Sequence, residues 1–328
     1  MEKACEFRGM CPIESLHGMV LVTRRGSIVD GQAGGLADVA AAVPCHSDTR
    51  FQLCSVSKQF TAVAVMLLVE SGRLDLGEPI NRWLPEAPAH WGHVTLHHLL
   101  CHTAGTPHWL EAPGLDPDEP MSSSQRLENT LATPLRTELG AEWHYSSPGY
   151  VLAGFIVERA SGQLYSDFLG ERILSPLHLN QTTVGGIPDG AARGYRDGQP
   201  VAPFDLDTML GAGDLWSTAR DLTRFTVAIH GGELLTSSSQ RAMRAAHAGI
   251  ADDDGIEPRL ITSGYGYGMF TGNFAGHHVT YHTGDNPGYQ SVVCWFPDCA
   301  ASIVILLNDE ATSLSALLRQ LLPAALEP

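Results

Sequence analysis

The chain has 328 residues, of which 44% are hydrophobic, and it carries 20 basic against 36 acidic side chains, a formal net charge of −16. A chain of this length and composition buries most of its unfolded surface, which excludes a disordered or fibrous protein. Basic residues form no cluster and no apolar run approaches the roughly 20 residues that cross a bilayer, so we expect neither nucleic acid nor a membrane as a partner.

Strands are predicted near both ends of the chain. The segment GMVLVTRRGSIVDG predicts a hairpin that turns at Arg25-Gly26. Three more strands separated by turns are predicted near the other end, followed by an apolar helix. In chain order these elements are the hairpin at 18–31, the strands at 277–284, 289–296 and 301–309, and the helix at 314–325.

The middle of the chain is mainly helical in pattern. Helices are predicted at 56–71, 95–102, 148–160 and 218–230, several of them ending at glycine. Strands at both ends with helices between them predict a sheet that carries a helical insertion. The long irregular stretches at 106–120 and 185–205 are typical of pocket walls or lids.

Lysine is rare in this sequence. Of the 20 basic residues 18 are arginine, and Lys58 is the one lysine besides Lys3. Apolar residues occur on every face of the helix that begins near Val56, so this helix is predicted to be buried. Lys58 then lies in a dry environment at a positive helix N-terminus, and both effects disfavour its ammonium form.

Ser55 lies three residues before Lys58, so the two side chains share a helix face. A neutral lysine can accept the serine proton, and bringing its pKa from about 10.4 to near 7 costs roughly 4–5 kcal/mol, which burial and the helix dipole can supply. Free N–H groups at the helix end, including that of Ser55, can hold an oxyanion. The alternative is that Ser55 only caps a core helix, and the local pattern leaves both readings open.

Three short motifs follow one another along the chain: SVSK at 55–58, YSS at 145–147 and HTG at 282–284. Together with longer segments such as FQLCSVSKQFTAVAVMLLVESGRLDLGEPINRWLPE, LHHLLCHTAG and HTGDNPGYQS, they make the sequence similar to the serine β-lactamases and penicillin-binding proteins over nearly its whole length. Within that superfamily it resembles class C β-lactamases, D-alanyl-D-alanine carboxypeptidases and the β-lactamase-like carboxylesterases and acyltransferases.

The resemblance implies an α/β (α+β) fold of the β-lactamase/transpeptidase type. Its features would be an antiparallel sheet of the five-stranded type, flanking helices and a mainly helical inserted subdomain. For a single catalytic domain over 1–328, this places the sheet subdomain at about 1–53 and 211–328 and the helical subdomain at about 54–210. The active site would lie in the cleft between them.

The resemblance also implies roles for the motif residues. Ser55 would be the nucleophile that becomes acylated and Lys58 its general-base partner. Tyr145 would be the second proton-transfer group. Because relatives do not settle which of Lys58 and Tyr145 takes the first proton, the two are assigned jointly.

The third motif would form the opposite wall of the cleft. His282 and Thr283 would hold the substrate, and the backbone N–H of Asp285, after Gly284, would be the second oxyanion donor beside that of Ser55. This role requires only main chain, so an aspartate is acceptable there.

Two motif positions depart from the family pattern. Ser147 stands where relatives have Asn and offers a shorter reach and fewer hydrogen bonds. His282 stands where many relatives have a Lys that binds a substrate carboxylate, and its charge depends on its surroundings. Both changes argue against penicillin-like substrates and favour the esterase and acyltransferase branch.

Other site types are not favoured. His98 and His102 share the i, i+4 spacing of a metal pair, but the sequence offers no third ligand. Glycine clusters at 31–35, 211–213 and 264–268 do not fit nucleotide-binding spacings, and Gly-x-Ser-x-Gly does not occur. We therefore expect no metal and no cofactor.

The leading hypothesis is a serine hydrolase that forms an acyl-Ser55 intermediate from a small-molecule ester or amide. A second hypothesis delivers the same acyl group to an alcohol or amine acceptor, and a third is a non-catalytic binding or sensory homologue. Seven scattered cysteines, at 5, 11, 45, 54, 101, 294 and 299, and an N-terminal segment without the apolar run of a secretion signal predict a soluble, cytoplasmic protein without disulfides.

Overall fold

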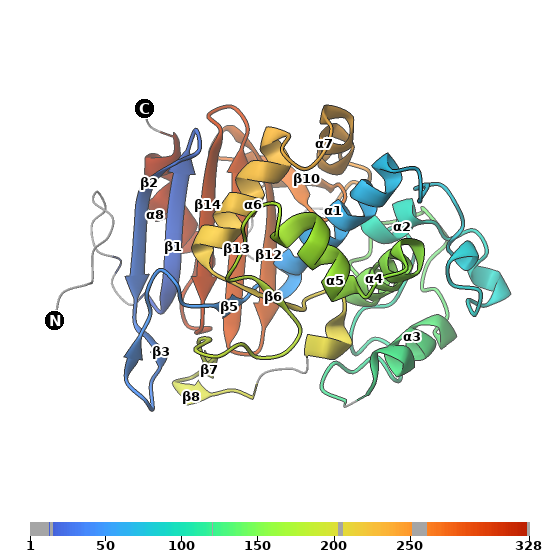
Figure 1. The fold of residues 1–328 in the computed structure, drawn as a ribbon, viewed down its shortest axis with the longest axis horizontal. Coiled ribbons are helices and arrows are strands. Elements are labelled where there is room, and N and C mark those ends of the chain that lie inside the picture. The colour runs from blue at the N-terminus through green and yellow to red at the C-terminus, as the bar shows by residue number, and fades with distance from the viewer. Residues whose placement is uncertain (1–12, 14–15, 120, 203–205, 251–260, 327–328) are drawn as a thin grey trace.

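The computed structural model describes residues 13, 16–119, 121–202, 206–250 and 261–326. An antiparallel sheet of seven strands dominates one side of the molecule, in the order β10-β11-β12-β13-β14-β1-β2 (Figure 1). Strand β1 pairs with β14, so the beginning and the end of the chain lie side by side in the sheet. The strands are β1 (Gly18–Arg24), β2 (Ser27–Gly34), β10 (Ile261–Tyr265), β11 (Phe270–Phe274), β12 (His277–Asn286), β13 (Tyr289–Phe296) and β14 (Ala301–Leu307).

Helices cover both faces of this sheet. Figure 1 shows α6 (Ala219–Gly231) across one face and α8 (Leu314–Leu326) behind the other. Leu21 of β1 belongs to the apolar cluster that contains α6, whereas the next residue, Val22, belongs to the cluster that contains α8. Successive side chains of a strand face opposite sides, and both sides are dry in the middle of the sheet, which explains why β1, β13 and β14 are mainly apolar along their whole length.

The predicted hairpin is present. Its turn at Arg25 (φ 51°) and Gly26 (φ 77°) places two consecutive residues in the left-handed region, as a two-residue hairpin turn with the twist of the flanking strands requires. The sequence predicts five of the seven strands, and the structure adds β10 and β11 at one edge. Glycines inside these two strands, such as Gly264 and Gly272, weaken the strand pattern in the sequence.

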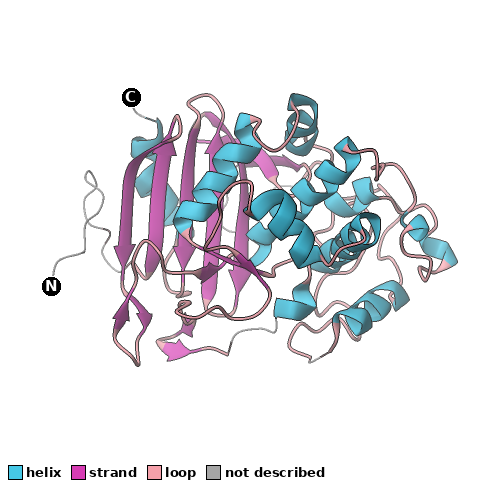
Figure 2. Ribbon diagram, in the orientation of Figure 1, coloured by secondary structure: helices cyan, strands magenta, loops and turns pink. Residues whose placement is uncertain are grey.

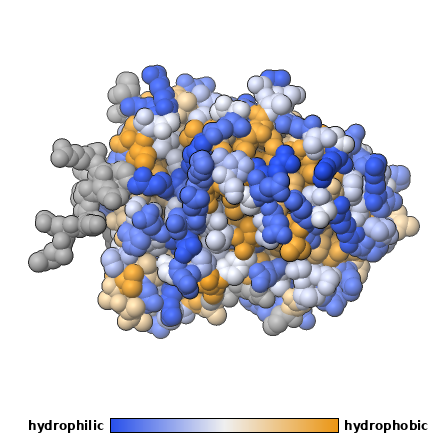
Figure 3. Space-filling model, viewed as in Figure 1, coloured by the Kyte–Doolittle hydropathy of each residue, from blue (hydrophilic) through white to orange (hydrophobic). Residues whose placement is uncertain are grey.

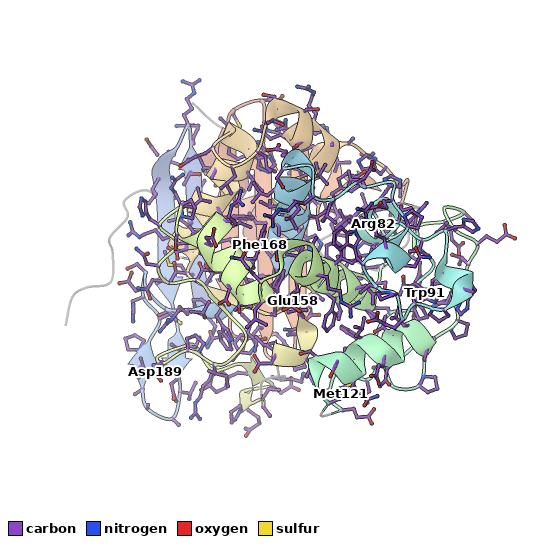
Figure 4. The ribbon with its side chains drawn as sticks, turned by 45° about the vertical axis from the view of Figure 1, so that its right-hand side comes forward. Arg82, Trp91, Met121, Glu158, Phe168 and Asp189 are labelled. Atoms are coloured by element: carbon purple, nitrogen blue, oxygen red, sulfur yellow. The ribbon has the colours of Figure 1, made fainter. Side chains whose placement is uncertain are left out.

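Helices and short turns fill the other side of the molecule (Figure 2). The remaining helices are α1 (Ser57–Glu70), α2 (Leu96–Leu100), α3 (Ser123–Ala132), α4 (Ser147–Ser161), α5 (Tyr165–Leu169) and α7 (Ser237–Arg244). Shorter helical turns are η1 (Cys54–Val56), η2 (Ile80–Arg82), η3 (Ala89–Trp91), η4 (Gly170–Leu174) and η5 (Leu206–Met209). Figure 4 shows Arg82 and Trp91 in the part of the helical region that lies far from the large sheet.

Local sequence signals account for the main helices. The side chains of Ser146 and Thr218 cap the N-termini of α4 and α6, and glycines in the left-handed conformation, Gly162 and Gly232, end them. Helix α2 is shorter than its prediction over 95–102. It ends at Leu100 because the chain turns away through His102, whose φ is 59°.

Helix α1 is buried on almost every side, as its sequence predicts. The rings of Phe60 on α1 and Phe225 on α6 stack in parallel with centroids 3.6 Å apart. Because α6 also packs on the sheet, this contact joins α1 to the sheet through an apolar core. Helix α1 is therefore held firmly behind η1, the turn that contacts β12.

Small sheets complete the fold. They are β3 (Leu36–Asp38) with β4 (Val43–Pro44), β7 (Tyr195–Arg196) with β8 (Gln199–Pro200), and the order β5-β9-β6 formed by β5 (Phe51–Gln52), β9 (Leu215–Ser217) and β6 (Thr183–Val184). Polar and charged residues cover most of the face drawn in Figure 3, with smaller apolar areas between them. Within the described ranges, no helix is both long and apolar enough to cross a bilayer. The division into subdomains at 54 and 210 stays a prediction.

Candidate active site

Ser55 lies in η1, at the junction between strand β5 and helix α1. The preceding residue, Cys54, has a φ of 50°, a left-handed conformation that is costly for a residue with a side chain. Val56 is the N-cap residue of α1, and no side chain caps this helix. Ser55 is therefore not a helix cap, and its hydroxyl is available for another role.

Lys58 reaches back from the first turn of α1 to Ser55. Its Nζ lies 3.0 Å from Ser55 Oγ, 3.0 Å from Ser147 Oγ and 2.6 Å from the carbonyl oxygen of Ala212. The lysine is completely buried, and this burial lowers its pKa from 10.5 to about 7. The sequence prediction of a dry lysine beside Ser55 is confirmed.

A neutral lysine fits these three neighbours. The carbonyl oxygen of Ala212 can only accept, so it takes one proton of Nζ. A second proton can go to Ser147 Oγ, which leaves the lone pair of the amine for the hydroxyl proton of Ser55. The geometry thus allows Lys58 to act as the base that deprotonates Ser55.

A buried carboxyl lies behind the lysine. Burial raises the pKa of Asp214 to about 7, while a hydrogen bond from the backbone of Gly211 to its Oδ2, at 2.9 Å, opposes part of this rise. Its other oxygen, Oδ1, has no hydrogen-bond partner among the described residues. The field of Asp214 in turn raises the pKa of Lys58, against the larger effect of burial. Asp214 was not predicted as a site residue, because a single acidic residue in a loop carries no motif.

Tyr145 and Ser147 occupy the wall next to Lys58. Lys58 Nζ lies 5.0 Å from the centre of the Tyr145 ring. Burial raises the pKa of Tyr145, and hydrogen bonds with Ser55 and Ser147 offset only part of this rise. Tyr145 is thus a neutral phenol at ordinary pH, in contact with the hydroxyls of both serines.

The YSS motif also forms hydrogen bonds with the loop that follows α2. Ser146 donates its N–H to His102 Nδ1 at 3.1 Å and its hydroxyl to the carbonyl oxygen of Pro107 at 2.8 Å. Ser147 donates its N–H to His108 Nδ1 at 3.1 Å. The start of α4 and the loop at 102–108 therefore form one rigid wall.

The HTG motif lies on β12, as predicted, and His282 is buried there. Its Nδ1 lies 2.6 Å from the carbonyl oxygen of Thr283, and its Nε2 lies 2.8 Å from the hydroxyl of Tyr265. Since a carbonyl only accepts, Nδ1 carries the proton and Nε2 accepts from Tyr265. Burial lowers the pKa of His282 to about 3, an effect that the nearby Lys58 increases. His282 is therefore neutral, and both its ring nitrogens are already bonded.

Strand β12 presents its free edge to Ser55. Strand β11 pairs with β12 only as far as Tyr281, whereas β13 pairs with it as far as Asn286. The stretch after Tyr281 lies against η1, and a Cβ on Gly284 would come within 2.8 Å of Cys54 Cβ. This approach brings the backbone of Asp285 to the cleft beside Ser55, as an oxyanion site made of their two N–H groups requires.

One cleft of about 1080 Å³ unites the predicted residues. It is lined by Ser55, Tyr145, His282, Thr283, Gly284 and Asp285, while Lys58 and Ser147 are buried behind its wall. The lining also includes residues that sequence analysis missed, among them His108, Glu111, Trp143, Phe270, Gln290 and Glu310. Their positions depend on tertiary packing, and the only sequence signal was the long irregular stretch at 106–120.

The two histidines with metal-pair spacing have other partners. His98 Nδ1 lies 2.8 Å from Thr95 Oγ1 and takes part in the capping box at the start of α2. His102 accepts from the backbone of Ser146. In the part of the chain that the structure describes, no three His, Cys, Asp or Glu side chains are grouped to hold a metal ion.

A serine paired with a buried lysine, in a cleft between an antiparallel sheet and a helical region, is the arrangement of serine hydrolases with a Ser-x-x-Lys motif. Residues 13–325 match the model of the β-lactamase family, and the chain belongs to this family. It is a serine hydrolase of the β-lactamase superfamily, with esterases and amidases among its homologues.

Individual relatives agree with this assignment. The chain is 29% identical to penicillin-binding protein 4* of Bacillus subtilis over 317 residues, 90% of this chain and 68% of that protein. It is 37% identical to esterase EstB of Burkholderia gladioli over 200 residues, which are 56% of this chain but only 50% of the esterase. The crystal structure of D-amino acid amidase from Ochrobactrum anthropi SV3 complexed with D-phenylalanine superimposes with a TM-score of 0.80 at 26% identity, covering 94% of both chains.

Proposed function

We propose that this enzyme cleaves small-molecule esters or amides through an acyl-Ser55 intermediate that water releases. The observation that carries the proposal is the 3.0 Å approach of a completely buried Lys58 Nζ to Ser55 Oγ. Burial makes the lysine neutral at a pH where an exposed lysine is charged, and a neutral amine at hydrogen-bond distance is a competent base.

In the first step, Lys58 takes the hydroxyl proton of Ser55 while Oγ forms a bond to the substrate carbonyl carbon. The carbonyl oxygen becomes an oxyanion, which the N–H groups of Ser55 and Asp285 stabilise. We assign the first proton to Lys58 rather than to Tyr145 because the pKa of the lysine is about 7, whereas the tyrosine pKa is raised by burial and the phenol keeps its proton.

In the second step, the leaving group departs with a proton from the Lys58 and Tyr145 pair. Tyr145 contacts the hydroxyls of Ser55 and Ser147, and Ser147 Oγ is bonded to Lys58 Nζ. This chain of hydroxyls gives the proton a path from the lysine to the leaving oxygen or nitrogen. Water then attacks the acyl carbon while the same pair removes its proton, and the bond between that carbon and Ser55 Oγ breaks as Oγ takes this proton back.

The charge state of His282 bears on the substrate class. In the folded protein this residue is neutral and its ring nitrogens contact Tyr265 and Thr283, so it offers no positive charge to a substrate carboxylate. This supports neutral esters or amides over penicillin-like acids. Relatives named as an esterase and as D-amino acid amidases support the same choice.

An acyltransferase remains the second candidate function, because an acyl-enzyme in a cleft of about 1080 Å³ has room for an alcohol or amine acceptor as well as for water. We also propose a cytoplasmic location. Support comes from the five cysteines in the described ranges, Cys45, Cys54, Cys101, Cys294 and Cys299, which are all free thiols.

The decisive experiment records the intact mass of the protein after brief exposure to an activated short-chain ester, with the released alcohol monitored. Continued release with little adduct would identify a hydrolase. A lasting adduct that an added alcohol or amine removes would identify an acyltransferase. The variant Ser55→Ala should show neither adduct nor release above background, and equal activity in this variant would refute the proposed nucleophile.

A further inference from the structure

The tautomer of His108 is fixed by its surroundings. Its Nδ1 accepts the backbone N–H of Ser147 at 3.1 Å, so this nitrogen carries no proton. Burial, with a contribution from Lys58, lowers the pKa of His108 to about 4, and the ring is therefore neutral at ordinary pH. A neutral imidazole without a proton on Nδ1 has it on Nε2.

The edge of the ring that bears Nε2 is the one available to a ligand. His108 lines the same cleft as Ser55, while its other edge is turned to Ser147 at the start of α4. The ring also meets the Tyr145 ring edge-on, with centroids 5.3 Å apart, so it lies next to the proton-transfer residues. Among the described residues, no hydrogen-bond partner is found for Nε2.

The loop that carries His108 is held in place from several directions. The hydroxyl of Ser146 bonds the carbonyl oxygen of Pro107 at 2.8 Å, and the N–H of His108 bonds Glu111 Oε2 at 2.6 Å. Glu111 is itself fixed by Arg136 at 2.6 Å and by His144 at 2.8 Å. A donor on such a loop is preorganised and loses little entropy when a ligand binds.

We propose that His108 is a specificity-determining residue whose Nε2–H binds an oxygen acceptor of the substrate close to the reacting carbonyl, so that the enzyme prefers esters or amides with such an acceptor over plain hydrocarbon ones. This inference rests on the proposed hydrolase function and adds the substrate class. A substrate without the acceptor leaves a half-buried donor unpaired in the cleft, which costs affinity. Ser147 cannot replace this donor, since its N–H is engaged with His108 and the residue is buried behind the wall of the cleft.

The test uses two pairs of esters of equal chain length. Methoxyacetyl and butanoyl esters of one alcohol differ by an ether oxygen on the acyl side, and 2-methoxyethyl and butyl esters of one acid differ by an ether oxygen on the alcohol side. The ratio of kcat/KM within each pair, divided by the ratio of their hydroxide-catalysed rates, gives the preference due to the enzyme. The pair that shows it identifies the side on which the acceptor lies.

His108→Asn retains an oxygen close to the position of Nδ1 for the N–H of Ser147 but has no donor at the position of Nε2. We expect the preference to fall about 3- to 10-fold in this variant, as for the loss of one neutral hydrogen bond. His108→Gln restores a donor near Nε2 and should recover part of the preference. The control His90→Asn, at an exposed histidine in η3, should leave the ratio unchanged.

A wild-type enzyme without preference in either pair would overturn the inference even if His108→Asn fails to fold. An unchanged preference in folded His108→Asn would also overturn it. Failure of the proposed function looks different, because wild type would then release no alcohol above the level of Ser55→Ala for any of the four esters.

Discussion

Gly284 of β12 lies directly against Cys54, the residue before the candidate nucleophile. A Cβ at position 284 would stand 2.8 Å from Cys54 Cβ and 2.5 Å from the carbonyl oxygen of Leu53. Cys54 has a left-handed φ of 50°, so the backbone of η1 turns at the point where it meets Gly284. We expect this close approach of strand and turn to set the separation of the N–H groups of Ser55 and Asp285.

Gly284→Ala should therefore impair both activity and stability. The new methyl group pushes β12 away from η1 and separates the two oxyanion donors, so we expect kcat to fall about 100-fold, as when one such donor is lost. Overpacking of this kind costs about 1–3 kcal/mol of unfolding free energy. Steady-state kinetics and thermal melts measure the two effects.

A matched control is Gly170→Ala, where a Cβ has no neighbour within 4 Å. This substitution should leave kcat unchanged and keep the melting temperature at or slightly above that of wild type. A Gly284→Ala enzyme with wild-type kcat would show that the contact with Cys54 does not set the oxyanion site.

Ser55→Ala should separate function from folding. The variant removes one hydroxyl whose partner, Lys58 Nζ, keeps Ser147 and Ala212 as acceptors. We expect activity to disappear while the melting temperature stays within a few degrees of wild type. A melt that is lowered by more than about 10 °C would assign Ser55 a structural role that the hydrogen bonds do not show. The exposed Ser166→Ala serves as the control for both readouts.

The rate should depend on pH through Lys58. Burial lowers the pKa of this lysine to about 7, and only its neutral form can accept the proton of Ser55. The value of kcat/KM should accordingly rise as pH increases through about 7 and level off above it. A rate that stays constant between pH 6 and pH 8 would place the base elsewhere.

Lys58→Arg tests the same assignment without removing the positive charge. Arginine keeps its proton at every pH used for proteins, so it cannot act as a base. We expect kcat to fall by at least about 100-fold, the usual contribution of general-base catalysis. Retained activity in a correctly folded Lys58→Arg protein would contradict the proposed mechanism, and circular dichroism checks the fold.

Local sequence signals predict many elements of this fold. Helix α4 is predictable because Pro148 opens it and Gly162 ends it, and helix α1 because its apolar residues surround Lys58. The outermost strand β10 and its neighbour β11 were not predicted, since their glycines resemble those of turns. Strand signals in a sheet edge depend on tertiary partners that the sequence pattern does not contain.

For the candidate site, the sequence predicts which residues come together but not their protonation states. The three motifs place Ser55, Lys58 and Tyr145 together because their spacing resembles that of a known superfamily, and the structure brings them to one cleft. The protonation state of each side chain depends on tertiary contacts. That His282 is neutral follows from its bonds to Tyr265 and Thr283, and neither contact has a signature in the sequence.

Substitution of Asp214 tests what sets the pKa of Lys58. Its carboxylate raises the pKa of Lys58, although burial has the larger and opposite effect. Removing the charge in Asp214→Asn should lower the pKa of Lys58 further, because nothing then favours the ammonium form from this side. The rising part of the pH–rate profile should accordingly move to lower pH, so that the variant retains a larger fraction of its maximal rate at pH 6 than wild type does.

The same substitution removes a buried acid whose pKa is raised to about 7. For an acid with a raised pKa, the folded state holds the proton more tightly than the unfolded state, so its contribution to stability falls as pH rises from 3.8 towards 7. Asn cannot lose a proton, so Asp214→Asn does not show this loss. The melting temperature of the variant minus that of wild type should therefore be larger at pH 8 than at pH 5. A pH–rate profile that stays in place or moves to higher pH would show that the charge of Asp214 does not raise the pKa of Lys58.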